Sequence, residues 1–185
     1  MEEKKFLGEL PEKLNLCLTE KGLLTDEVLI FAETDMDVSC EFRHRILILT
    51  EKSLIIGSHK EKTENLIDCS PFSAKRRKAD DYDFESVALE RISSAKTDGL
   101  VVGGVLRMNI DGTEKHICAF TNAYKFRVDR LCEVLNLKAN GEEISEDKLY
   151  EEKRIEKCPK CGHRYPDSNR MICPKCMDKR KLFFR

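Results

Sequence analysis

Four cysteines near the C-terminus constrain this chain more than any other feature. They form two C-x-x-C pairs, Cys158-Pro-Lys-Cys161 and Cys173-Pro-Lys-Cys176, separated by eleven residues. Each pair directs two sulfur atoms at one point, and Zn²⁺ takes four thiolates tetrahedrally. A shell of four protein ligands stabilises a fold and leaves no position open for substrate. The spacing predicts a structural zinc ribbon, with two disulfides or an iron–sulfur cluster as the alternatives.

His163 follows the first cysteine pair and is an alternative ligand, although the four cysteines already complete a zinc shell. The other cysteines are scattered without paired spacing, and we expect each to be a small buried hydrophobic residue. They are Cys17, Cys40, Cys69, Cys118 and Cys132.

Charge is divided unevenly along the chain. From Lys153 onward there are eleven Lys and Arg against three Asp and Glu, a formal charge of +8. Because the net charge is −1, residues 1–152 carry −9. The last residues, Lys179-Arg-Lys-Leu-Phe-Phe-Arg185, are basic and then apolar, as at the start of an interfacial helix. The positive charge from Lys153 onward therefore predicts an anionic partner, either phosphate headgroups or nucleic acid. The basic and then apolar ending predicts that the chain is a fragment of a longer protein. The alternative is a tail that packs on the ribbon.

The body of the chain has the pattern of a β-rich domain. Apolar runs at 27–33, 42–49 and 53–57 predict strands, and the last two are expected to form a hairpin. Another strand region covers 84–96. The clearest hairpin joins 105–110 to 113–120 through Asp111-Gly112, because both positions of this turn need positive φ.

One helix is predicted over residues 122–137, with Thr121 or Asn122 as its cap. Tyr124, Val128, Leu131 and Leu135 recur on one face of this helix. Such a stripe needs an apolar surface, and the open end of a small antiparallel barrel supplies one. The N-terminal twenty residues stay ambiguous, because Pro11 interrupts a helical spacing and residues 14–18 also fit a strand.

Motifs for catalysis are missing from the sequence. It has no G-x-x-x-x-G-K-[ST] phosphate loop, and its histidines show no H-E-x-x-H or paired spacing. His44 and His116 are expected to be ordinary sheet residues. We therefore expect a protein that is not itself an enzyme, with no catalytic or cofactor-binding residues beyond the metal ligands.

Several segments resemble the cytosolic region that precedes the membrane part of certain bacterial ABC exporters. In the body of the chain they are Asp83-Phe-Glu-Ser-Val-Ala-Leu-Glu-Arg-Ile-Ser, Leu100-Val-Val-Gly-Gly-Val-Leu and Phe120-Thr-Asn-Ala. The junction with its two cysteine pairs, Cys158-Pro-Lys-Cys161-Gly and Cys173-Pro-Lys-Cys176, is also similar. The resemblance covers roughly residues 25–185 and implies a pleckstrin-homology-like (PH-like) barrel capped by a C-terminal helix, then a zinc ribbon. Together with the charged, apolar-poor stretch at 138–157, it predicts a barrel domain with an N-terminal extension over 1–137, a linker over 138–157, and a ribbon with a basic membrane-proximal segment over 158–185.

Two functions follow as expectations. The first is a non-catalytic accessory or regulatory region of an ABC exporter, on the cytoplasmic side of the membrane, with structural Zn²⁺ on Cys158, Cys161, Cys173 and Cys176. Its partners would be the transmembrane and nucleotide-binding domains of the parent chain and an anionic membrane surface. The alternative is a free-standing zinc-ribbon protein that contacts nucleic acid through its basic residues. No apolar stretch of the chain is long enough to cross a bilayer, and no signal peptide opens it, so we expect it to be soluble and cytosolic by itself.

Overall fold

The computed structural model describes residues 4–37, 39, 42–60, 81–101, 103–152, 155–157 and 164–166. The chain divides into two compact units. We call Phe6–Leu149 the sheet unit, and Met1–Lys5 with Tyr150–Arg185 the C-terminal unit. The sequence also predicts a long polar loop or insertion over residues 59–83, and most of it lies outside the described residues.

The sheet unit is mainly β, as the sequence predicts. Its strands form one antiparallel sheet of seven strands in the order β5-β4-β3-β2-β8-β7-β6. The strands are β2 (Val28–Met36), β3 (Phe42–Thr50), β4 (Ser53–His59), β5 (Tyr82–Ala88), β6 (Ile92–Leu100), β7 (Gly103–Ile110) and β8 (Thr113–Thr121). The helices are α1 (Glu12–Glu20) and α2 (Lys125–Ala139), with 3₁₀ turns η4 (Leu89–Arg91) and η5 (Glu146–Leu149). Among the described residues, no helix is long and apolar enough to cross a membrane.

Both predicted hairpins are confirmed. β3 and β4 pair with Leu49 opposite Leu54, and β7 and β8 pair with Ile110 opposite Thr113. The second turn has Asp111 at φ 53° and Gly112 at φ 76°, the left-handed conformations that an Asp-Gly turn supplies.

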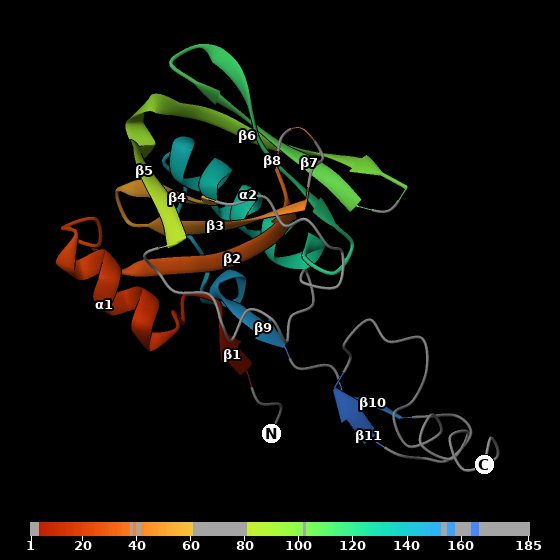
Figure 1. Ribbon diagram of the computed structural model, residues 1–185. Coiled ribbons are helices and arrows are strands. Elements are labelled where there is room, and N and C mark those ends of the chain that lie inside the picture. Colours follow the sequence, from red (N-terminus) through yellow and green to blue (C-terminus); the bar gives the residue numbers. More distant parts are fainter. Residues whose placement is uncertain are drawn as a thin grey trace. The chain divides into compact units, whose positions relative to one another are not determined.

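The two helices cover opposite faces of the sheet (Figure 1). Leu47 and Leu49 of β3 belong to the cluster that includes α2, whereas Ile46 and Ile48 belong to the cluster that includes α1. Side chains alternate across a strand, so a strand buried on both faces has a continuous apolar run. This two-sided burial explains why residues 46–49 are all apolar.

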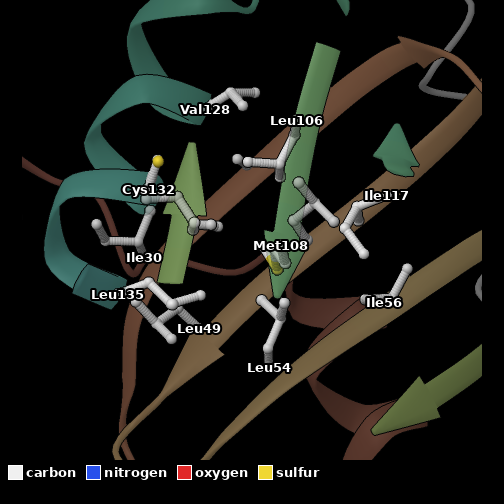
Figure 2. Close-up of a cluster of buried hydrophobic side chains, with 14 of the residues drawn as sticks. Ile30, Leu49, Leu54, Ile56, Leu106, Met108, Ile117, Val128, Cys132 and Leu135 are labelled. Atoms are coloured by element: carbon white, nitrogen blue, oxygen red, sulfur yellow. The ribbon is translucent and has the colours of Figure 1, made fainter. Parts of the chain in front are cut away.

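Helix α2 places its predicted stripe in the larger core cluster. Val128, Leu131 and Leu135 are at most 1% exposed, and Tyr124 packs against the cluster at its border. Figure 2 shows side chains of α2 facing strand residues such as Leu106 and Leu49. The predicted cap was wrong, because the helix begins after Tyr124 and has no side-chain cap. Thr121 instead donates its N–H and hydroxyl hydrogen bonds to the Asp35 carboxylate.

The predicted closed barrel was also wrong, because the sheet is open. Its outer strands β5 and β6 follow one another through η4 and do not pair. The physical reason lies along β6, where α2 occupies the edge. The Asn136 amide accepts a hydrogen bond from Ala95 N–H at 2.7 Å and donates one to Ala95 C=O at 2.7 Å. The Asn136 side chain thus hydrogen-bonds to the two backbone groups of Ala95 that another strand would need in order to pair with β6 at this edge.

This edge contact predicts a measurable loss on substitution. Asn136→Ala leaves the N–H and C=O of Ala95 without these partners, and we expect a destabilisation of about 1–3 kcal/mol. Asn140→Ala is the control, because the Asn140 amide contacts only the nearby exposed Glu142; its effect should stay within about 0.5 kcal/mol. Urea unfolding of both variants gives the comparison, and equal stabilities would contradict a structural role for Asn136.

The C-terminal unit contains two short strand pairs. β1 (Lys4–Phe6) pairs with β9 (Tyr150–Glu152), and β10 (Ile155–Lys157) pairs antiparallel with β11 (Arg164–Pro166). Within the range predicted as a linker, residues 138–157, Ile144 and Leu149 pack against the core of the sheet unit.

Candidate functional site

The predicted zinc ligands lie outside the described residues. These are Cys158, Cys161, Cys173 and Cys176, together with the alternative ligand His163. The flanking strands are described, with Lys157 of β10 opposite Arg164 of β11. The first C-x-x-C therefore falls, by sequence, within the connection of an antiparallel strand pair. The described residues contain no group of three or more His, Cys, Asp or Glu side chains that could hold a metal ion.

The sheet unit contains a cavity of about 330 Å³ between its two halves. One wall comes from β3, β4 and β5, and the other comes from η4, β7 and β8. The apolar lining consists of Ile56, Phe84, Val87, Ile110 and Ile117. The polar lining consists of Arg45, Ser58, Asp83, Glu85, Arg91, Lys115 and His116. Sequence reasoning missed this site, because its residues are far apart along the chain and match no motif.

Some of the charged side chains at the rim of the cavity form ion pairs. Arg91 Nε lies 3.1 and 3.0 Å from the two carboxylate oxygens of Asp111, and Arg91 Nη2 also donates to Asp111. This guanidinium holds the pKa of the Asp111 carboxyl below its usual range. Lys60 Nζ lies 3.7 Å from Asp83. The Arg91 and Asp83 charges are thus largely compensated.

Arg45 lies deeper in the cavity wall. Its Nη1 donates to the Ile117 carbonyl, which ties β3 to β8. Its Nε is buried and has no hydrogen-bond partner among the described residues. The cavity therefore has a guanidinium whose donors are only partly used.

A second polar cluster lies on the face of the sheet that α1 covers. The His44 side chain is buried, with Nδ1 in a 2.6 Å hydrogen bond with the Tyr82 hydroxyl. The Tyr82 ring meets His59 edge-on at 5.1 Å between ring centres, and His44 Nε2 lies 3.6 Å from Glu33. His44 lies in a strand, as predicted. Its bond to Tyr82 was not foreseeable, because only the β4–β5 pairing brings Tyr82 to this face.

Two of the scattered cysteines are confirmed as buried. Cys118 and Cys132 are 0% and 7% exposed, whereas Cys17 is half-buried, and Cys40 and Cys69 lie outside the described residues. Burial raises the pKa of the Cys118 thiol to about 12 and that of Cys132 to about 11. These two groups act as apolar packing atoms and not as nucleophiles.

Thiol labelling tests this assignment. At pH 8 a thiol of pKa about 12 has roughly one part in 10⁴ as thiolate, so Cys118 should resist iodoacetamide in the folded protein. Cys17 is the internal control and should react faster. Peptide mass spectrometry after native and urea-denatured labelling gives both rates. Native labelling of Cys118 as fast as that of Cys17 would contradict the burial.

The cavity and the buried His44–Tyr82 pair are the clearest groupings of polar side chains in the sheet unit. Each is assembled from strands that only the sheet topology brings together. Neither grouping corresponds to a motif that the sequence carries. No family model, no curated protein and no solved structure matches this chain.

Proposed function

We propose that this chain is the cytosolic accessory region of an ABC-type exporter, a PH-like domain followed by a zinc ribbon that positions or regulates the transporter. The carrying observation is the order of elements in the sheet unit. Strands β2 to β5 form one antiparallel meander, β6 to β8 form a second, and α2 then packs on the inner face. This order supports a PH-like domain, and the absence of a closed barrel is compatible with it.

The C-terminal unit supports the zinc ribbon. β10 and β11 pair with Lys157 opposite Arg164, so they immediately bracket the first cysteine pair in the sequence. A short antiparallel strand pair on either side of a C-x-x-C suits a metal knuckle, because it brings the two ends of the turn together. Four thiolates would give a closed, structural Zn²⁺ site with no catalytic position.

The charge distribution supports a membrane-proximal position for the basic end. Residues from Lys153 onward carry +8, and three apolar residues, Leu182, Phe183 and Phe184, precede the final Arg185. Lys and Arg near an anionic bilayer surface contribute about 1 kcal/mol each, and apolar side chains add burial in the interface. Residues 1–152 carry net negative charge and would be repelled by the same surface. Attachment should therefore depend on residues 179–185 alone, which we call the end segment.

Vesicle binding tests the proposal. The chain should bind vesicles of mixed phosphatidylserine and phosphatidylcholine weakly, and binding should fall as salt is added. Replacing Lys179, Arg180 and Lys181 by Gln removes three charges, so we expect affinity to fall roughly 100-fold. The matched control replaces Lys4, Lys5 and Lys13, outside the basic end, and should bind normally. Sedimentation with the vesicles measures the bound fraction.

Nucleic-acid binding is the alternative function. It is favoured by the basic charge of the ribbon, but Tyr165 is the only aromatic residue between the two cysteine pairs for base stacking. A chain that ends at Met177 keeps the ribbon and most of its basic residues. Tight, salt-sensitive binding of DNA or RNA by that shorter chain, with no vesicle binding by the full chain, would overturn the exporter proposal.

A further inference from the structure

The cavity of the sheet unit combines an apolar floor with unpaired positive charge. Its floor is made by four branched side chains that are each at most 7% exposed, namely Ile56, Val87, Ile110 and Ile117. Ile56 and Ile117 appear at the border of the core cluster in Figure 2. A volume of about 330 Å³ lies at the lower end of the range for small-molecule sites.

Two cations of the lining stand out once the ion pairs are assigned. Arg91 is bound by Asp111, and Asp83 is bound by Lys60. Arg45 and Lys115 have no carboxylate within ion-pair distance among the described residues. Glu85 is the remaining acidic group of the lining, and its charge favours the protonated form of Arg91. Lys115 also acts through its charge on the Asp111 carboxylate. The cavity lining has three cations, Arg45, Arg91 and Lys115, against two carboxylates, Asp83 and Glu85.

Arg45 gives a second reason to expect an anion. Its Nη1 donates to the Ile117 carbonyl, whereas its buried Nε has no acceptor among the described residues. A carboxylate in the cavity would accept hydrogen bonds from guanidinium donors of Arg45 that the Ile117 carbonyl leaves unused. Arg45 reaches Ile117, two residues from Lys115 on β8, so both cations can approach one ligand.

We propose that this cavity binds an amphiphilic organic anion, with a carboxylate head at Arg45 and Lys115 and a short hydrocarbon body on the isoleucine and valine floor. A bare inorganic anion would gain nothing from the apolar floor, and a neutral hydrocarbon would gain nothing from the two cations. Because the cavity has both an apolar floor and two cations, its ligand should have both a hydrocarbon body and an anionic group. This inference concerns the sheet unit alone and does not depend on the exporter proposal.

Octanoate is the probe, and the full chain is the protein. Titration followed by ¹H–¹³C methyl NMR should show saturable shifts at Ile56, Val87 and Ile117, with a Kd below about 1 mM. Octanol has the same hydrocarbon body without the charge, whereas acetate and inorganic phosphate have the charge without the body. We expect each of the three to bind at least about tenfold more weakly than octanoate.

Two variants test the assigned residues. Lys115→Gln should weaken octanoate binding about tenfold and leave octanol binding unchanged. Lys13→Gln on α1 lies outside the cavity lining and should bind octanoate normally. Ser58→Phe fills the cavity with a side chain and should abolish the methyl shifts. Circular dichroism spectra like that of the parent protein show that each variant is folded.

Several results would overturn the proposal. Octanol binding as tight as octanoate would show a merely apolar cavity, and acetate binding as tight as octanoate would show charge alone. Shifts confined to residues outside the lining, or no saturation up to about 1 mM octanoate, would remove the site. A failure of vesicle binding would leave this inference intact, because the vesicle test depends on the end segment.

Discussion

Removal of zinc from the proposed ribbon should unfold that ribbon while the sheet unit stays folded. An unfolded segment has no preformed metal site, so metal binding and folding of residues about 155–178 are one event, with an apparent stabilisation on the order of 10 kcal/mol. The sheet unit has its own core, and the predicted ligands fall by sequence in the C-terminal unit. Chelation should therefore remove the β10–β11 pairing and leave the seven strands of the large sheet paired.

Elemental analysis and one cysteine substitution test whether the ribbon folds only when zinc is bound. Protein purified without chelators should contain about one zinc per chain. Cys161→Ser should lose the metal and show fast amide hydrogen exchange in β10 and β11, with unchanged protection in β3 and β8. Cys17→Ser is the control, because Cys17 lies in α1 and outside the predicted ligand set, so its zinc content should be normal.

The alternatives to zinc give different results in the same samples. Two disulfides would leave the four ligand cysteines unreactive to thiol reagents after denaturation without reductant, and an iron–sulfur cluster would give visible absorbance and bound iron. A zinc content below about half an equivalent would argue strongly against the ribbon. Unfolding of the large sheet on chelation would show that the two units do not fold independently.

Local signals were sufficient to predict much of the sheet. The β7–β8 hairpin follows from Asp111-Gly112, because few other residues tolerate positive φ at both turn positions. The α2 stripe follows from its spacing alone. The N-terminal segment stayed ambiguous because Pro11 looks like an interruption, yet it directly precedes the first residue of α1, where proline costs no hydrogen bond. Leu14 and Leu18, one turn apart, then face the sheet.

Features that depend on contacts between distant residues could not be predicted. The barrel was expected to close because local patterns give strands but not their partners. In the structure Asn136 of α2 bonds to the backbone of β6 at Ala95, and it lies 41 residues after Ala95 in the chain, so no local pattern reveals this contact. The cavity was missed for the same reason, since Arg45 reaches the Ile117 carbonyl across 72 residues. A single arginine within a strand gives no sequence signal that it will line a cavity together with aliphatic side chains.

Leu131→Ala should destabilise the sheet unit by roughly 2–5 kcal/mol, because the residue has no exposed surface and the core around it cannot fully collapse. Leu131 lies in the middle of α2 and belongs to the same core cluster as Leu47, Ile56 and Leu106, so truncation leaves a cavity within that cluster.

The matched control is Leu16→Ala, the same substitution in helix α1 at a side chain that is 57% exposed. Alanine is the better helix former, and little burial is lost, so its effect should stay within about 0.5 kcal/mol. Urea unfolding, followed by circular dichroism, gives the free energy of unfolding of the two variants and of the parent protein. The values are compared when the dependence of this free energy on urea concentration is the same for all three. Equal losses for both variants would mean that α2 contributes no more to the core than an exposed helix face, and the packing of α2 against the large sheet would have to be abandoned. A loss at Leu131 several times that at Leu16 would instead show that α2 contributes a buried face to the core, packed against β2 of one meander and against β6 and β7 of the other.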